Sequence, residues 1–374
     1  TRVRSSAASD VYKRQLERYA SLNGVPFDGK PLGSGPYIFR SWTRGGDMRF
    51  DANPNYFRGA PKIPHVVIRF IPDQNTMVNA LRAHDIDLYY LVSTSQAPAV
   101  RTIPDTTFTQ VATFNGEGLT FNTQRPPLDD VRVRLALCYA FDEKSVFRNI
   151  YHSLGGQGPT RMAPGLLGFD PAIHYYPYDP QKAAALLDAA GWNLGPNGLR
   201  MKNGKPLAIE LSTVSGVKLR EELEVVLQRA WRAVGIDVSV KNYAASLYFA
   251  PAGDGGPLYG GRMHVEIHTS SHVYPDPDIE NVLAPDRLPP VGENFSRFRN
   301  AELGRLIAAG LASYDPAVRA PIYRRIAQIE IANVPDYVLS WEPQIMAANS
   351  DLHGLRPNPT GSDLWNINTW TFRP

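Results

Sequence analysis

The chain has 374 residues, of which 43% are hydrophobic and 20% are charged, as in an ordinary globular protein with one large core or two smaller ones. Its formal net charge of +3 is small, and no basic run is interleaved with aromatic residues, so nucleic acid is not an expected partner. No apolar stretch reaches the length of a membrane-spanning helix. The one cysteine, Cys138, can form no internal disulfide and is expected in a buried helical position.

The first residues are expected to add nothing to the fold. Residues 1–16 contain neither the apolar segment nor the small-residue cleavage site of a signal peptide, and residues 6–15 look like translated sequencing adapter. We therefore expect residues 1–16 to be non-native or disordered. On this interpretation the chain is truncated at its N-terminus, and its export signal is missing.

Helices are predicted from apolar spacing together with the residues that begin and end them. An N-cap acceptor, a proline in the first turn and a glycine after the last turn are the start and stop signals. They predict a helix from Asp179-Pro180 to Gly191, a helix with an apolar stripe from Leu219 to Val234 ended by Gly235, and a helix opened by Asp315-Pro316.

Short strands are predicted between these helices. Residues 66–71 are continuous and β-branched, residues 118–122 end in a polar tip, and residues 236–240 alternate directly after a helix. Strands that alternate with helices indicate an α/β architecture. Residues 122–130 and 347–354 are predicted crossovers between two lobes joined by a hinge.

Four groups of motifs follow one another along the chain, and together they carry a resemblance. They are Gly33-Ser34-Gly35-Pro36-Tyr37 with Asn53-Pro54-Asn55-Tyr56-Phe57; Phe121-Asn122 with Pro126-Pro127-Leu128-Asp129-Asp130-Val131-Arg132-Val133-Arg134; Tyr178-Asp179-Pro180 with Ala190-Gly191-Trp192; and Tyr274-Pro275-Asp276-Pro277 with Asn294-Phe295-Ser296. In order and spacing they resemble the peptide and nickel type solute-binding proteins of ABC importers, bacterial extracellular solute-binding protein family 5. The resemblance covers about residues 31–370.

The resemblance implies an α/β fold with two lobes, the periplasmic-binding-protein type II fold of the peptide/nickel-binding cluster. Residues 17–130 and 352–374 would belong to the first lobe, and residues 131–351 to the second. The N-terminal half of the family's first lobe is absent from the chain, so this lobe is expected to be incomplete.

The resemblance also implies the substrate-binding subunit of an ABC importer. Such a protein captures a peptide-like or other small polar solute between its lobes and delivers it to permease subunits in the membrane. It would be a monomer at the periplasmic or extracellular face, with no cofactor, no catalytic residue and no enzymatic activity. The residues expected to contact the ligand are Phe121, Asn122, Met162, Tyr248, His268, Ser270, Ser271, Tyr274, Asp278 and Asn294.

The identity of the ligand stays open. In peptide-binding members of the family an aspartate directly before the Tyr-Pro-Asp-Pro run pairs with the ligand's amino terminus, and here that position is Val273. The tryptophan common three residues earlier is Ser270. A buried ammonium needs a carboxylate partner or strong acceptors, a role that Asp276 or Glu266 would have to fill. An oligosaccharide or a metal chelate is therefore an alternative ligand.

An enzymatic alternative depends on histidines. His264, His268 and His272 recur at intervals of four, which would suit a metal-dependent hydrolase on a helix, but their neighbours favour a strand, and no metal ligands are assigned. Asp276 and Asp278 would supply its carboxylates. The favoured interpretation of Asp278 is instead an N-terminal cap of the helix that follows.

Overall fold

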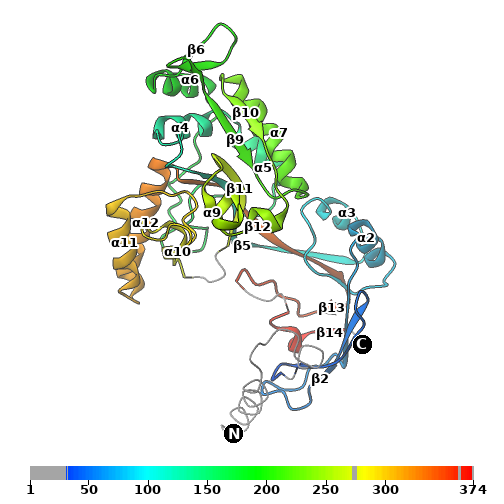
Figure 1. Cartoon of the computed structure of the whole chain (residues 1–374). Coiled ribbons are helices and arrows are strands. Elements are labelled where there is room, and N and C mark those ends of the chain that lie inside the picture. The colour runs from blue at the N-terminus through cyan, green and yellow to red at the C-terminus, as the bar shows by residue number, and fades with distance from the viewer. Residues whose placement is uncertain (1–30, 32, 272–275, 361–363, 373–374) are drawn as a thin grey trace. The chain divides into compact units, whose positions relative to one another are not determined.

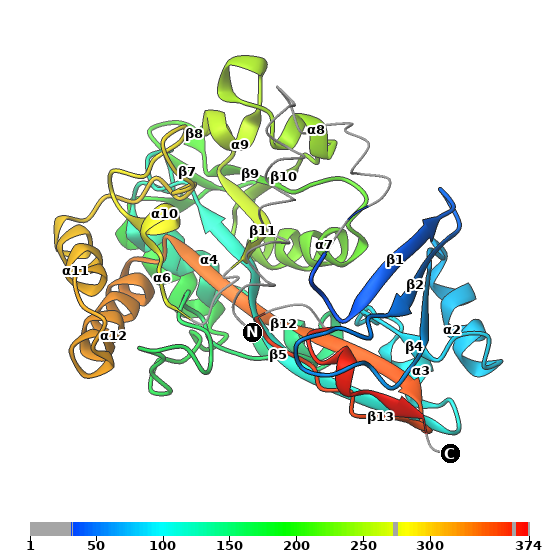
Figure 2. The same ribbon diagram turned by 90° about the horizontal axis from the view of Figure 1, so that it is seen from below.

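The computed structural model describes residues 31, 33–271, 276–360 and 364–372, apart from the side chains of 269–271. The chain divides into two compact units, unit 1 from residues 1–110 and 345–374 and unit 2 from residues 111–344. Two long strands, β5 (Thr106–Phe121) and β12 (Asp336–Asn349), carry the chain from one unit into the other (Figure 2). The expected lobe boundaries lie just beyond these two strands, and the lobe assignment stays a prediction.

Unit 1 is built on a small antiparallel sheet in the order β1-β2-β3. Its elements are β1 (Tyr37–Trp42), β2 (Asp47–Ala52), β3 (His65–Arg69), α2 (Gln74–Arg82), β4 (Leu88–Tyr89), α3 (Ala97–Arg101), β13 (Leu352–His353), η3 (Ile367–Thr369) and β14 (Thr371–Phe372). Strand β4 pairs with the last part of β12, and β13 pairs with β14. Its core contains Ala348, Leu352, Ile367 and Trp370.

Unit 2 surrounds a mixed sheet in the order β10-β9-β11-β5-β12. The strands are β6 (Asn193–Leu194), β7 (Arg200–Lys202), β8 (Lys205–Pro206), β9 (Ala208–Ser212), β10 (Asp237–Val240) and β11 (Val265–Ser271). The helices are α4 (Val131–Tyr139), α5 (Glu143–Asn149), α6 (Pro180–Ala189), α7 (Lys218–Ala233), α8 (Ala245–Tyr248), η2 (Ala252–Asp254), α9 (Pro257–Gly260), α10 (Glu280–Leu283), α11 (Ala301–Leu311) and α12 (Pro316–Asn333). Strand β11 runs antiparallel to β5 and parallel to β9.

One face of the unit 2 sheet forms its largest hydrophobic core. Leu119 and Phe121 of β5 and Val265 and Ile267 of β11 point into this core, where they meet α4, α6 and α7. Trp231 of α7 is fully buried there, and its indole N–H donates to the Leu137 carbonyl over 2.9 Å. Figure 1 shows α7 lying along β10, and α11 packs on α12 elsewhere in the unit. Apolar side chains fill this face of the sheet, so the polar side chains of the same strands point to the opposite face.

The predicted helices are confirmed together with their caps. Asp179 accepts from the Lys182 amide over 2.8 Å at the start of α6, and Asp315 accepts from the Ala317 amide at the start of α12. Helix α7 ends directly before Gly235, whose φ of +90° is a left-handed conformation that suits glycine. No helix in the described ranges is both long and apolar enough to cross a membrane.

The predicted strands are also confirmed, with different ends. Residues 66–71 form β3, residues 236–240 form β10, and residues 118–122 form the last part of β5. The sequence did not predict that β5 is 16 residues long. Its first half is only partly buried and lacks the apolar alternation that identifies a strand. Cys138 is buried on α4, as expected.

The cap of α6 gives a direct stability test of the local structure. Replacing Asp179 with alanine leaves the first amides of α6 without their acceptor and is expected to lower the free energy of unfolding by about 1 kcal/mol. Urea denaturation measures the change. Lys205→Ala, an exposed change on β8, is the control and should stay within about 0.5 kcal/mol of the wild type. Equal losses in both variants would contradict the assigned cap.

Candidate functional site

Polar side chains gather on the face of the unit 2 sheet that is turned away from the main core. In the antiparallel pair of β5 and β11, Glu266 lies opposite Thr120, and His268 lies opposite Gly118. Residues opposite each other point to the same face of a sheet, so Thr120, Glu266 and His268 share one side. With Arg161 and Asp336 they form what we call the polar face.

A buried ion pair anchors the polar face. Arg161 Nε lies 3.0 Å from Asp336 Oδ2, and the two side chains are 3% and 4% exposed. Thr120 donates its hydroxyl proton to the same carboxylate, and the Arg161 amide donates to Glu330 Oε1 over 2.9 Å. Burial raises the pKa of Glu330 to about 8, so this carboxyl is mostly protonated near neutral pH. The anchor is therefore one compensated charge pair surrounded by neutral donors and acceptors.

Glu266 and His268 carry the unpaired polar atoms of this face. Tyr248 donates its hydroxyl proton to Glu266 Oε2 over 3.0 Å, but Glu266 Oε1 and His268 Nδ1 are buried without a hydrogen-bond partner among the described residues. These two atoms are 3.6 Å apart, too far for a hydrogen bond. Burial raises the pKa of Glu266 to about 8, against the opposing effect of the Tyr248 bond. Burial, reinforced by Arg161, lowers the pKa of His268 to about 3, so both groups are neutral at pH 7.

The cavities at the polar face are very small. One of about 10 Å³ is lined by Thr120, Arg161, His268 and Asp336, among others, and another of about 10 Å³ by Asn122, Glu266 and neighbouring residues. A cavity of this size holds roughly one water molecule. Each of these two cavities is therefore too small to hold a ligand by itself.

Three of the residues predicted to contact a ligand lie in the interior instead. Phe121 is fully buried in the main core, because its side chain points to the opposite face from Thr120. Met162 packs in the core between α10, α11 and α12. Asn294 is fully buried, and its amide donates to the carbonyls of Ala284 and Phe298. Their burial gives no support to ligand contact, which stays a prediction for all three.

Asn122, Tyr248 and His268 are brought together near the polar face. Asn122 Nδ2 donates to the Gly261 carbonyl over 3.0 Å, and its side chain lines the same small cavity as Glu266. The Tyr248 hydroxyl bonds to Glu266, and the His268 ring lies edge-on to Phe295, with ring centres 6.1 Å apart. For these residues ligand contact stays a prediction.

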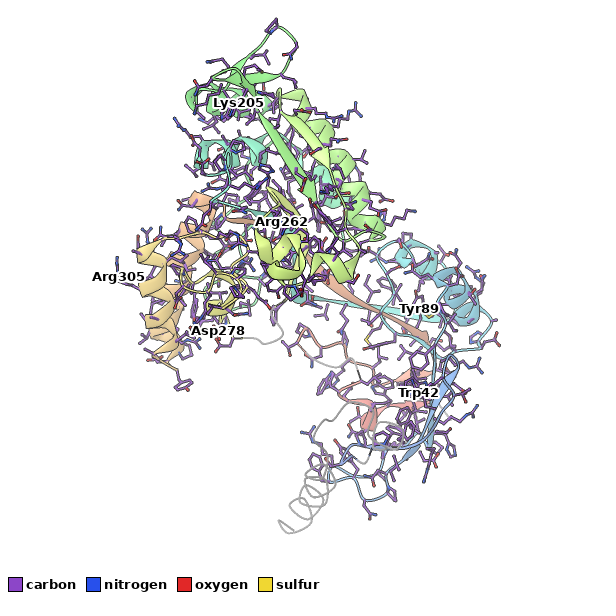
Figure 3. The ribbon with its side chains drawn as sticks, in the orientation of Figure 1. Trp42, Tyr89, Lys205, Arg262, Asp278 and Arg305 are labelled. Atoms are coloured by element: carbon purple, nitrogen blue, oxygen red, sulfur yellow. The ribbon has the colours of Figure 1, made fainter. Side chains whose placement is uncertain are left out.

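The other predicted contacts lie on or after the end of β11. The backbones of Ser270 and Ser271 belong to β11, and their side chains lie outside the described part of the structure, as does all of Tyr274. Asp278 Oδ1 accepts from the Glu280 amide over 3.0 Å just before α10, although Ile279 and not Asp278 occupies the N-cap position (Figure 3). Asp276 forms two hydrogen bonds with Arg319, of 2.8 and 2.7 Å.

The histidine run gives no metal centre in the described residues. His264 precedes β11, where its Nε2 lies 3.1 Å from Arg125 Nε and its Nδ1 lies 3.2 Å from the Glu210 amide nitrogen. His268 belongs to β11, so the helical arrangement that would align the run does not occur. His272 lies outside the described residues. Among those described, no group of three or more histidine, cysteine, aspartate or glutamate residues is placed to hold a metal ion.

Arg161, Thr120 and Asp336 were not predicted as site residues. They come from a loop and from two strands that are distant in the sequence. No local spacing links an arginine with an aspartate 175 residues later, and the pair forms because the loop that carries Arg161 lies beside the start of β12. Thr120 was detectable in principle, because it alternates with Leu119 and Phe121 and therefore points away from their core.

A much larger cavity of unit 2 lies elsewhere. It measures about 820 Å³, is lined mainly by α5 and the segments 153–159 and 169–178, and shares no lining residue with the cavities of the polar face. Size alone does not identify a functional site, so the polar face is assigned by its chemistry and not by volume.

Comparison with known proteins relates this chain to binding proteins of bacterial importers. It is 26% identical to heme-binding protein A of Haemophilus influenzae and 30% identical to the nickel-binding periplasmic protein of Escherichia coli, in each case over 83% of the chain. The chain covers only 54% and 59% of the lengths of these two relatives, less than two thirds of each.

Comparison of the fold with solved structures also relates the chain to bacterial binding proteins. The oligopeptide-binding protein AppA of Bacillus subtilis, solved in complex with a nonapeptide, matches 97% of this chain and 71% of its own with a TM-score of 0.77 and 25% identity. This likeness confirms the expected two-lobed α/β fold class. The family model described as bacterial extracellular solute-binding proteins, family 5, middle part, matches residues 6–279. The chain therefore belongs to family 5 of the bacterial extracellular solute-binding proteins.

Proposed function

We propose that this chain is the larger part of the substrate-binding subunit of an ABC importer, and that the polar face of unit 2 is one wall of its ligand site. In the complete protein the solute would be held between two lobes and handed to permease subunits in the membrane. The location would be the periplasmic or extracellular face. Binding and release require no chemical step, only a higher affinity for the closed state than for the open one.

The observation that carries the proposal is that Glu266 Oε1 and His268 Nδ1 are buried and have no hydrogen-bond partner in the part of the chain that the structure describes. A buried polar atom without a partner costs about 1–3 kcal/mol, a cost that a ligand or an ordered water removes by bonding to it. A protonated Glu266 offers a donor, and a neutral imidazole offers a donor or an acceptor according to its tautomer. The wall therefore favours neutral hydrogen-bonding groups.

This chemistry supports a peptide-like or other small polar solute. The amide groups of a peptide backbone and the hydroxyl groups of an oligosaccharide both satisfy such a wall. A ligand ammonium would find its nearest carboxylates here already engaged, since Asp336 is paired with Arg161 and Glu266 is protonated near pH 7. We propose that the part of the solute facing unit 2 is uncharged.

The test uses the full-length protein. Thermal-shift screening with tripeptides, oligosaccharides and nickel chelates is expected to identify one class that raises the melting temperature. His268→Ala should then weaken that solute about tenfold or more, because one buried hydrogen-bonding group is lost. His65→Ala, on the exposed face of the unit 1 sheet, is the control and should leave the affinity unchanged. Stabilisation by none of the three classes, or equal affinity of wild type and His268→Ala, would argue against the proposal.

A further inference from the structure

The large cavity beside α5 combines features that the polar face lacks. Its volume of about 820 Å³ lies in the range of small-molecule sites. About half of its wall is aromatic or apolar, and every lining residue belongs to unit 2. The apolar and aromatic lining residues are Phe147, Pro159, Phe169, Pro171, Ile173, Tyr175, Tyr176, Pro177 and Tyr178.

A single buried acid lies among these walls. The Glu143 side chain accepts from Gln157 Nε2 over 3.0 Å, and the residue is 5% exposed. Within the described part of the chain no arginine, lysine or histidine forms an ion pair with it. Burial raises its pKa to about 7, with Asp142 acting in the same direction and Lys144 and the Gln157 bond opposing it. A ligand cation would remove this desolvation cost by pairing with the carboxylate.

The hydroxyl groups of two wall tyrosines are already engaged with the protein. Tyr175 accepts from the Gly158 amide over 2.9 Å, and Tyr176 donates to the Ile331 carbonyl over 2.7 Å. With these hydroxyls held, the two residues offer the cavity chiefly their rings. Aromatic rings beside a carboxylate suit an ammonium group that is attached to an apolar body.

Bases lie at the exposed rim of the same cavity. Lys144 and Arg148 are exposed and one helical turn apart on α5, while Glu143 and Phe147 occupy the neighbouring, more buried stripe of the same helix. Asp142 is exposed and lines the cavity too, so the opening carries two bases and one acid, while Glu143 lies at the buried part. A zwitterion whose amino group enters first matches this order of charges.

We propose that the cavity beside α5 is a second ligand site, which binds a small zwitterionic solute such as an amino acid with an aromatic or aliphatic side chain. Glu143 binds the ammonium group, the aromatic walls hold the side chain, and Lys144 with Arg148 bind the carboxylate. The site lies within unit 2 and does not depend on the function proposed above.

Calorimetric titration of this chain with phenylalanine tests the proposal. Saturable binding at millimolar phenylalanine is expected, and Glu143→Gln should weaken it about tenfold or more, because a charge-assisted hydrogen bond becomes a neutral one. Glutamine has the same shape and removes a buried ionisable group, so the variant is expected to fold. Glu302→Gln on the surface of α11 is the matched control and should bind like the wild type.

A second comparison tests the rim. Lys144→Ala with Arg148→Ala should weaken phenylalanine several-fold but leave phenylalaninamide, which lacks the carboxylate, unchanged. No saturable binding by the wild type, or equal affinities of wild type and Glu143→Gln, would overturn the second site. Binding that is lost in His268→Ala but kept in Glu143→Gln would also overturn it and would leave the proposed function in place.

Discussion

Replacing Arg161 with methionine is expected to lower the free energy of unfolding by about 3–5 kcal/mol. Methionine keeps much of the apolar bulk but leaves the Asp336 carboxylate 4% exposed and without its cation. The bond from Thr120 cannot compensate a full buried charge. Urea denaturation at pH 7 measures the loss.

The companion variants separate charge from packing. Arg161→Met combined with Asp336→Leu removes both charges and should recover most of the lost stability, because a buried ion pair can be exchanged for apolar residues at small net cost. Arg325→Met breaks the exposed pair with Glu302 and should cost less than about 1 kcal/mol. An equal loss in Arg161→Met and Arg325→Met would show that the anchor of the polar face is not a buried pair.

Glu266→Gln is expected to change how stability depends on pH. The pKa of Glu266 is about 8 in the folded state, against about 4.3 for an unperturbed glutamate. Between these values the folded state binds more protons than the unfolded state, so the Glu266 contribution to stability is fully present below pH 4.3 and is lost as the pH rises through about 8. Glutamine does not titrate. The variant should therefore match the wild type near pH 4 and exceed it increasingly up to pH 8, with a constant difference above.

Melting curves of both proteins from pH 4 to pH 9 measure this difference. Glu143 and Glu330 also have raised pKa values, but they titrate in both proteins, so their contributions cancel in the stability difference between variant and wild type. Glu222→Gln is the control: this residue is exposed on α7 beside Lys218, and its replacement should give no such trend. Parallel curves for wild type and Glu266→Gln would contradict the assignment of a protonated buried acid on β11.

Much of the fold could be predicted because its signals are local. Asp179, Asp315 and Gly235 mark helix ends by their own chemistry, and the structure uses all three as predicted. The family and its fold class followed from ordered motifs over most of the chain. The length of β5 was not predicted because the side chains of its first half are only partly buried, so no alternation of apolar and polar residues marks that half as a strand.

The polar face could not be predicted because its members meet only through tertiary structure. Thr120 meets Asp336 only because β5 and β12 are neighbours in the sheet. Arg161 reaches the same carboxylate from a loop that hydrogen-bonds to the start of β12. Phe121 and Asn294 were expected at a ligand because their motifs carry the family resemblance, yet the structure uses both residues for packing or internal hydrogen bonds. A motif identifies a family more readily than it separates its structural residues from those that touch ligand.

The most direct test of the central claim is a crystal structure of the complete protein with the solute that thermal-shift screening identifies. The account predicts a polar atom of that solute, or one water bound to it, within hydrogen-bond distance of His268 Nδ1 or Glu266 Oε1. A bound solute with every contact away from Thr120, Glu266 and His268 would contradict it.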